Sequence, residues 1–443
     1  MGDGGDVMRL SYFANIVDLG DGKYLLLRPG SPPLVVDRDV VDVLNDPSKA
    51  PDDVVDVLSR HGILTDLLPE EERALAFSLF GNGSSGVGRY SVAITYNCNF
   101  ACVYCYERKI KKENTITLEM VDKFYEIATS KLKEGRISRN IGITGGEPLM
   151  NEHADVLEYI LSEGKRRGFA FDVISNGYEL VDFVDLLRKN NVLAVKVTID
   201  GPREIHNRRR IHINRSGTFD RILEGVKAAT EKGITITIFV NVDSQNVESI
   251  PELVSSLREE DVDSLILLKR VNERSGVRYP FALSPEEYFA RVFRIIREHN
   301  LHNVGLYEFD VFYSDFLNAV FGGKPIPGRL KYCGATQGDV MIFDPRGDLY
   351  PCDYLLGNRS FRIGTYFPEF KLNRNHLLWS NRSADRIPKC FGCKLAPICA
   401  GGCPMEAYAR HGTIYAPYCD EFRYLFEYVK LKLSMIAGRD KND

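Results

Sequence analysis

Cys98-Asn99-Phe100-Ala101-Cys102-Val103-Tyr104-Cys105 is the stretch that decides the fold, because it places three cysteines directly after a predicted strand. Three thiols cannot all pair among themselves as disulfides, and three thiolates are one ligand short of a closed tetrahedral zinc site. They suit a four-iron, four-sulfur cluster in which one iron keeps an open coordination position. Cys98, Cys102 and Cys105, called the triplet below, therefore predict a catalytic iron–sulfur cluster.

The other seven of the ten cysteines lie late in the chain, at Cys333, Cys352, Cys390, Cys393, Cys399, Cys403 and Cys419. In a reducing compartment, grouped thiols favour metal binding over disulfides. We therefore predict that these seven hold further clusters. A structural zinc ribbon is the alternative for the run from Cys390 to Cys403, but it would leave the remaining three late cysteines unexplained.

The triplet resembles the signature of the radical S-adenosylmethionine (SAM) enzymes, and the late cysteines resemble the SPASM extension of members that modify peptides and proteins. The resemblance implies SAM and three four-iron clusters as cofactors, and it places Tyr104 near the adenine of SAM. One auxiliary cluster is then held by Cys390, Cys393, Cys399 and Cys419, and the other by Cys333, Cys352 and Cys403. Residues 325–330 lack the eighth cysteine of fully ligated relatives. The second auxiliary cluster is thus expected to have an open iron or a ligand other than cysteine.

Polar motifs follow the next predicted strands of the chain. Gly145-Gly146-Glu147-Pro148 follows the second strand, and its glycines are expected to let the backbone approach a ligand closely. By resemblance, this motif holds the methionine amino group of SAM. Ser175 and Asn176 end the third strand, and the family uses that position to bind the ribose hydroxyls.

Asp200 and the arginine run at residues 208–210 follow the fourth strand. By resemblance, Arg210 pairs with the methionine carboxylate as a fork, while Arg208 and Arg209 are expected to be solvated. Asn241 and Asp243 follow the fifth strand and are further candidates for the pocket. The histidines at 206, 212, 302 and 411 show no ligand spacing and are expected to be structural.

Tyr350-Pro351-Cys352-Asp353-Tyr354 resembles the anaerobic sulfatase-maturating enzymes. In those enzymes the aligned aspartate is the candidate base that takes a proton from the substrate radical. Asp353 is therefore a predicted catalytic residue. The alternative is a turn residue whose carboxylate bonds its own backbone.

Strand and helix patterns alternate through the middle of the chain. Six strands are predicted, at residues 91–95, 140–144, 170–175, 194–199, 235–240 and 264–268. The predicted fold class is α/β, a partial (β/α)6 TIM-like barrel with loops at the carboxyl ends of its strands forming the active site. The predicted domains are residues 1–88, 89–321 (the radical SAM barrel) and 322–443, a loop-rich iron–sulfur (SPASM) domain.

Residues 1–88 read as three short strands followed by helices at 37–44 and 52–61, each opened by an aspartate that can cap it. This order resembles the small winged-helix module that binds leader peptides in ribosomal-peptide maturases. The alternative is a structural cap without a binding role. In the C-terminal domain, a further helix is predicted at residues 420–436.

Composition narrows the possible partners. The net charge is −4, with no basic excess for nucleic acid and no apolar run long enough to span a membrane. The first residues lack the apolar stretch of a signal peptide. These features predict a cytoplasmic protein with no nucleic-acid or membrane partner.

The sequence thus predicts a radical SAM oxidoreductase that abstracts a hydrogen from a peptide or protein. A thioether crosslink in a ribosomally made peptide is the preferred reaction. Oxidation of Cys or Ser to formylglycine, as in sulfatase maturation, is the alternative, and carbon–carbon crosslinking or decarboxylation is a third. A non-catalytic iron–sulfur electron carrier is the alternative of another class. Expected partners are the substrate with a possible leader peptide, and a reductant such as flavodoxin or ferredoxin.

Overall fold

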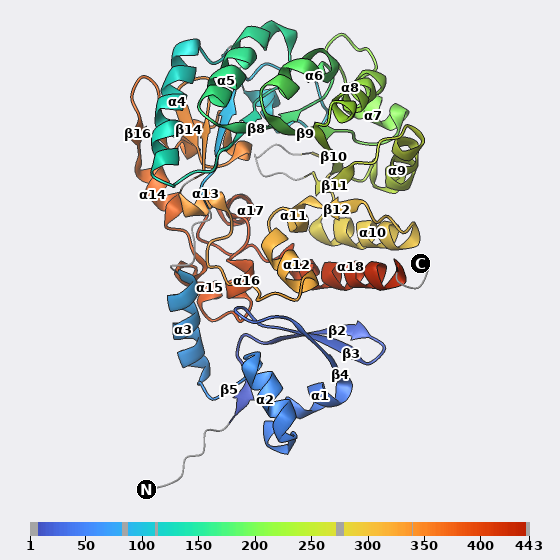
Figure 1. The fold of residues 1–443 in the computed structure, drawn as a ribbon, viewed down its shortest axis with the longest axis vertical. Coiled ribbons are helices and arrows are strands. Elements are labelled where there is room, and N and C mark those ends of the chain that lie inside the picture. The colour runs from blue at the N-terminus through green and yellow to red at the C-terminus, as the bar shows by residue number, and fades with distance from the viewer. Residues whose placement is uncertain (1–7, 82–86, 111–113, 272–278, 339, 440–443) are drawn as a thin grey trace. The chain divides into compact units, whose positions relative to one another are not determined.

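The computed structural model describes residues 8–81, 87–110, 114–271, 279–338 and 340–439. By contact the chain forms two compact units (Figure 1). The first unit comprises Met1–Ser84, Glu308–Tyr332 and Arg382–Asp443. The second, called the barrel unit, comprises Ser85–Tyr307 and Cys333–Asn381. The predicted C-terminal segment is therefore divided between the two units.

A parallel sheet runs through the barrel unit. Its strands neighbour one another in chain order from β6 to β12, and all of these pairs are parallel. They are β6 (Tyr90–Ala93), β7 (Asn140–Thr144), β8 (Ala170–Ser175), β9 (Val192–Thr198), β10 (Thr235–Val242), β11 (Leu265–Arg270) and β12 (Val304–Leu306). The six predicted strands and the parallel partial barrel are confirmed. The seventh strand, β12, was not predicted.

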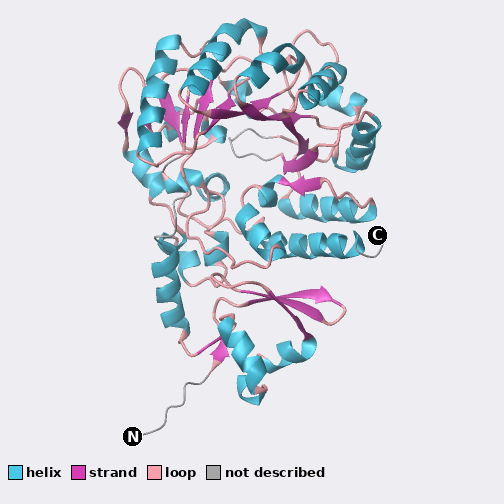
Figure 2. Ribbon diagram, viewed as in Figure 1, coloured by secondary structure: helices cyan, strands magenta, loops and turns pink. Residues whose placement is uncertain are grey.

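Helices cover the outer side of this sheet (Figures 1 and 2). They are α4 (Leu118–Lys133), α5 (Ala154–Arg166), α6 (Leu180–Lys189), α7 (Arg203–Arg209), α8 (Phe219–Glu231), α9 (Ile250–Glu259) and α10 (Pro285–Glu298). The strands alternate with period two. On β10, for example, Ile238 and Val240 are fully buried, whereas Phe239 and Asn241 line a cavity inside the barrel.

The sheet continues beyond β6 with short strands that the sequence patterns did not indicate. β13 (Met341–Phe343) pairs parallel with β6, and β14 (Asp348–Tyr350), β15 (Gly364–Thr365) and β16 (Lys371–Leu372) follow in antiparallel order. Two or three residues are too few for a period to register. This extension attaches Cys352 and Asp353, directly after β14, to the sheet whose first strand precedes the triplet. The helices α13 (Gly334–Gln337) and α14 (Arg374–Ser380) belong to the same region.

The N-terminal module, residues 8–81 of the first unit, has the predicted strand-then-helix order. A three-stranded antiparallel sheet has the order β2 (Asn15–Gly20), β3 (Lys23–Leu27) and β4 (Leu34–Asp37). It is followed by α1 (Arg38–Val43) and α2 (Asp52–Arg60), and β1 (Arg9–Leu10) pairs with β5 (Leu64–Thr65). The predicted caps are wrong. Asp37 precedes α1 without a side-chain capping bond, and Pro51 occupies the position before α2.

A third helix of the module, α3 (Pro69–Gly81), was not predicted. Its Phe77 and Phe80 pack against Leu330, Ile387 and Cys390 of the same unit. The module is thus joined to the late cysteines through a shared apolar cluster. The other helices here are α12 (Ser314–Phe321), α15 (Pro388–Phe391), α16 (Ala396–Cys399), α17 (Pro404–His411) and α18 (Leu425–Arg439), and the chain passes between the units at α11 (Tyr307–Asp310). The predicted helix at 420–436 begins later than expected. Among the described helices, none is both long and apolar enough to cross a membrane.

Candidate active site

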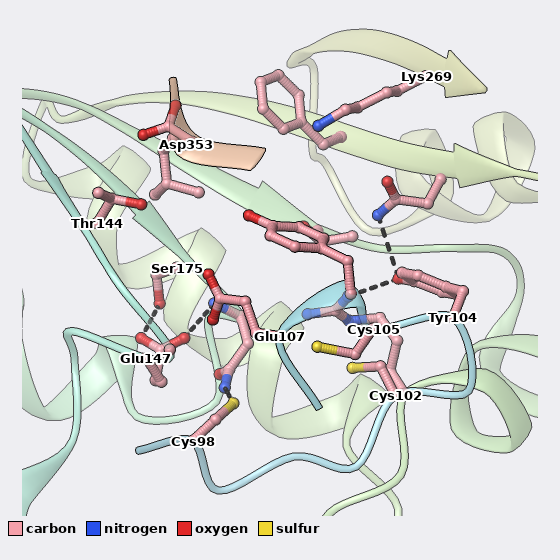
Figure 3. A pocket seen from close by; sticks show the side chains of 18 of the residues that line it. Cys98, Cys102, Tyr104, Cys105, Glu107, Thr144, Glu147, Ser175, Lys269 and Asp353 are labelled. Atoms are coloured by element: carbon pink, nitrogen blue, oxygen red, sulfur yellow. Dashed lines mark hydrogen bonds between the residues drawn. The ribbon is translucent and has the colours of Figure 1, made fainter. Parts of the chain in front are cut away.

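A cavity of about 220 Å³ opens inside the barrel unit. Its wall is formed by the loop after β6, by the carboxyl ends of β7 to β11, and by the turn after β14 (Figure 3). All three triplet cysteines line it. Parallel strands present their carboxyl ends at one edge of the sheet, which is why loops far apart in sequence meet here.

None of the three triplet thiols is part of a disulfide. Burial raises the pKa of Cys98, with Glu147 and Cys102 adding to it. Burial also raises the pKa of Cys102, to about 11. These two thiols therefore favour the protonated form without a metal, and binding as thiolates to a cluster must release their protons. Three thiols that line one cavity and form no disulfide fit a cluster that leaves one iron open.

The glycines after β7 lie against protein backbone rather than in open space. A Cβ on Gly146 would lie 2.1 Å from the carbonyl oxygen of Asn97, and one on Gly145 would lie 2.5 Å from that of Thr95. Gly145 also has a φ of +131°, where side chains are strained. The motif thus needs glycine because its loop crosses the loop that begins the triplet. The close approach at these glycines is therefore to protein backbone, whereas the sequence predicted a close approach to a ligand.

Glu147 is an acidic group of the cavity, which Glu107 also lines, and it is almost completely buried. Its carboxylate accepts hydrogen bonds from the Ser175 hydroxyl (2.7 Å) and the Asn176 amide N–H (2.5 Å). Burial raises the pKa of Glu147 to about 7, although these hydrogen bonds oppose the rise. A carboxyl group in this position can pair with an ammonium group of a ligand. The attraction between the two is strongest when the carboxyl group is ionised.

Ser175 and Asn176 are committed to protein contacts. The Asn176 side-chain amide donates to the Oδ1 atom of the Asn99 side chain at 2.7 Å and approaches the Cys98 sulfur at 3.9 Å. Its oxygen accepts from the Tyr178 N–H. Both residues line the cavity, and their predicted bonds to ribose hydroxyls stay a prediction.

Tyr104 lies at the centre of a buried polar network. Its hydroxyl donates to Asp200 and accepts from Arg210 at 2.7 Å and from the Asn241 side chain at 3.1 Å. Asp200 also accepts from the Asn241 backbone N–H at 2.9 Å. The predicted site residues from β9 and β10 are thereby brought together, and they hold the tyrosine ring at the edge of the cavity.

Arg209 corrects the expectation of a solvated side chain. Only Arg208 of the two is exposed, whereas Arg209 is 3% exposed and pairs with the fully buried Asp243 at 2.5 Å. It also donates to the Asn241 carbonyl at 2.9 Å, and its guanidinium lies over the Tyr104 ring at 5.2 Å. The helix α7 turns one arginine outward and the next inward, a difference that a run of identical residues cannot show.

Asp353 and Lys269 line the same cavity as the triplet. In Figure 3 they lie at the end of the view away from the three cysteines. Burial raises the pKa of Asp353, and Lys269, Arg89 and Lys196 oppose the rise. Within the described part of the chain, the Asp353 carboxylate forms no hydrogen bond to its own turn. The turn is closed instead by the Leu356 N–H, which donates to the backbone oxygen of Asp353. Lys269 was not predicted as a site residue from the sequence. The one feature that could have indicated it is its position as a cation directly after the sixth predicted strand.

Four of the late cysteines gather in the first unit. Burial raises the pKa of Cys390 to about 11 and that of Cys399 to about 12, and in both cases the other thiols of the group contribute. Burial and Cys393 likewise raise the pKa of Cys419. This mutual effect fits the first predicted auxiliary cluster. Across the described residues, no group of three or more His, Cys, Asp or Glu side chains is arranged so that it could hold a single metal ion.

The second predicted auxiliary set is divided between the units. Cys333 and Cys352 belong to the barrel unit and Cys403 to the first unit. Their assignment to one cluster stays a prediction. His206 is fully buried and its Nδ1 accepts the Asp200 N–H at 3.2 Å. This placement fits the expected structural role, which stays a prediction.

Comparison with known proteins agrees with this geometry. Residues 92–257 match the model of the radical SAM superfamily. These residues form a radical SAM domain. Enzymes of that superfamily use SAM and a four-iron cluster. The assignment of such a cluster to the triplet stays a prediction.

Curated relatives match most of the length of this chain. The cysteine-type anaerobic sulfatase-maturating enzyme of Clostridium novyi is 22% identical over 367 residues, covering 77% of this chain and 94% of that protein. The serine-type enzyme of Bacteroides thetaiotaomicron is 25% identical over 357 residues, covering 71% and 81%.

Two solved structures share the fold. Native anSMEcpe with bound AdoMet and a Cp18Cys peptide aligns with a TM-score of 0.62 at 18% identity, covering 80% of this chain and 99% of that one. Streptococcus suis SuiB bound to its precursor peptide SuiA aligns with a TM-score of 0.56 at 15% identity, covering 92% and 98%.

Proposed function

We propose that this enzyme is a maturase that abstracts a hydrogen atom from a peptide or protein and installs a side-chain modification, namely a thioether crosslink from a cysteine. The observation that carries the proposal is that the triplet and Asp353 line the same cavity. Relatives named as sulfatase-maturating enzymes and neighbours with bound peptides support a substrate of this class.

Each end of the cavity has its own task. When bound, the cluster and SAM supply a 5′-deoxyadenosyl radical that abstracts a substrate hydrogen. Glu147 and Arg210 hold the amino and carboxylate groups of SAM, and Tyr104 borders its adenine. Asp353 takes the proton that the substrate releases as it is oxidised.

The thioether reaction is supported by the cysteine count. Three cysteines for the second auxiliary cluster leave one iron without a thiolate from this chain, and a substrate cysteine can fill that position. In the reaction a C–H and an S–H bond break and a C–S bond forms. One hydrogen atom goes to the adenosyl carbon, one proton to Asp353, and one electron to the auxiliary cluster.

Formylglycine formation is the second candidate. It is favoured by the place of Asp353 in the cavity and by the names of the curated relatives. It needs the same base and the same electron acceptor, but water enters and the sulfur of a substrate cysteine leaves. An electron carrier without catalysis would need no SAM pocket, and the built network around Tyr104 argues against it.

The N-terminal module is proposed to bind a leader peptide as an added strand. Its sheet has β2 and β4 as edge strands in the described chain, and Val35 on β4 is 58% exposed. Main-chain pairing along such an edge gives affinity with little demand on sequence. Removing the whole module would strip Phe77 and Phe80 from the apolar cluster around Cys390, so a point variant is the cleaner test. Val35→Glu should weaken leader binding, and Ile16→Glu on the other edge strand should not.

The proposed function is tested with peptides encoded next to the gene and with synthetic cysteine peptides. A flavodoxin or ferredoxin serves as reductant. Deuterium on the substrate carbon should appear in 5′-deoxyadenosine, and the product should lose two hydrogens and keep its sulfur. A product that exchanges sulfur for oxygen would establish formylglycine formation instead. SAM cleavage with no change in any peptide or sulfatase tested would overturn the maturase proposal.

A further inference from the structure

Lys269 is a cation in the cavity that the proposed chemistry does not use. It lies near the carboxyl end of β11, beside Asn241 of β10 in register, and its side chain lines the cavity with Asp353. Figure 3 shows it on the side of the pocket away from the triplet. It therefore faces the part of the cavity left to the substrate when SAM occupies the triplet end.

Two tyrosines hold the ammonium group in place. Its Nζ lies 4.7 Å from the ring centroid of Tyr307 and 4.8 Å from that of Tyr354. Tyr354 itself packs on Tyr106 at 5.4 Å, which stiffens this wall. A cation between aromatic faces is attracted by the rings but donates no conventional hydrogen bond to them.

No described residue gives Lys269 a hydrogen-bond acceptor or an ion pair. Asp353 feels its charge, yet the two form no ion pair, unlike Lys196, whose Nζ lies 4.0 Å from Asp172. An ammonium carries three N–H donors. A ligand that enters the cavity and removes water from this group must supply an acceptor, and a carboxylate does so with a matching charge.

We propose that Lys269 binds a carboxylate of the substrate, so that the enzyme selects peptides with an acidic group beside the residue it modifies. This inference rests on the proposed function, because it names the substrate class of the same cavity. The carboxylate comes from an Asp or Glu side chain or from the C-terminus of the peptide.

Three synthetic peptides of one sequence, each with a single cysteine, distinguish these sources. The first has Glu beside the cysteine and an amidated C-terminus. The second has Gln and a free C-terminal carboxylate, and the third has Gln and an amide. Binding to the reconstituted enzyme with SAM is measured by fluorescence anisotropy for the wild type, Lys269→Met and Lys269→Arg.

The wild type should bind one acidic peptide at least about tenfold more tightly than the neutral one, which corresponds to about 1.4 kcal/mol. Lys269→Met should lose this preference, and Lys269→Arg should keep part of it. Lys196→Met is the matched control, since it removes a barrel cation that does not line the cavity, and it should keep the preference. Equal binding of all three peptides by the wild type, or a preference that survives Lys269→Met or disappears in Lys196→Met, would overturn the inference.

A peptide-independent arm separates this inference from the proposed function. N-acetylglutamate and N-acetylglutamine are compared by thermal shift on the same variants, with SAM affinity as a check that each is folded. A Lys269-dependent preference for the acid without turnover of any peptide would retain the carboxylate-binding site at Lys269 and overturn the maturase assignment. Peptide turnover without any acid preference would do the reverse.

Discussion

Replacing Arg209 by methionine tests the buried ion pair that the structure places behind Tyr104. Arg209 is 3% exposed and its partner Asp243 is fully buried, with 2.5 Å between Nη1 and Oδ2. The variant keeps the length of the side chain but leaves the Asp243 charge without its partner. It also removes a donor to the Asn241 carbonyl.

Breaking a buried pair by removing one partner costs about 3–5 kcal/mol. With about 2 °C of Tm per kcal/mol for a large unit, the loss is about 6–10 °C. Arg208→Met is the matched control, because the neighbouring side chain is exposed, and it should change Tm by about 1 °C or less.

The assay is thermal unfolding of both variants by circular dichroism, with SAM affinity measured in parallel. Arg209→Met/Asp243→Asn should recover part of the loss, because the uncompensated charge is then absent. SAM binding should weaken in Arg209→Met, since the guanidinium also lies over the Tyr104 ring. If Arg209→Met unfolds within about 1 °C of Arg208→Met, the buried pair is not stabilising and the reasoning fails.

Three further predictions follow from the site. Reconstituted protein should bind about twelve irons and a variant with the triplet changed to alanine about eight; an iron content near four, with zinc making up the difference, would contradict three clusters. SAM affinity, measured by equilibrium dialysis, should rise as pH increases through about 7, because Glu147 has its pKa there and binds the ammonium of SAM when ionised; Glu147→Gln should bind SAM about tenfold more weakly without this pH dependence. Asp353→Asn should keep 5′-deoxyadenosine formation and lower product yield by at least about tenfold; normal coupling would leave Asp353 a turn residue.

Local patterns identified the barrel and the triplet end of the site from sequence. Six strands were found because their apolar runs are separated by helices with clear periodicity, and the triplet and its glycine motif follow the first two. The same reasoning failed where the signal is short or repeated. Strands of two or three residues after residue 340 carry no period. In the arginine run, identical letters hide one exposed and two buried side chains.

The sequence by itself thus determined the cofactor chemistry, because that chemistry depends on residue types at fixed local spacing around one loop. Only the tertiary structure decided which groups share a cavity with the triplet. Asp353 is distant in the chain from the triplet, and it reaches the same cavity because β13 pairs with β6 and extends the sheet. Lys269 joins them because strands of a parallel sheet end at one edge, so that residues far apart in sequence become neighbours. Such long-range pairing depends on strand order and burial, and neither can be predicted from the spacing of residues within one loop or strand.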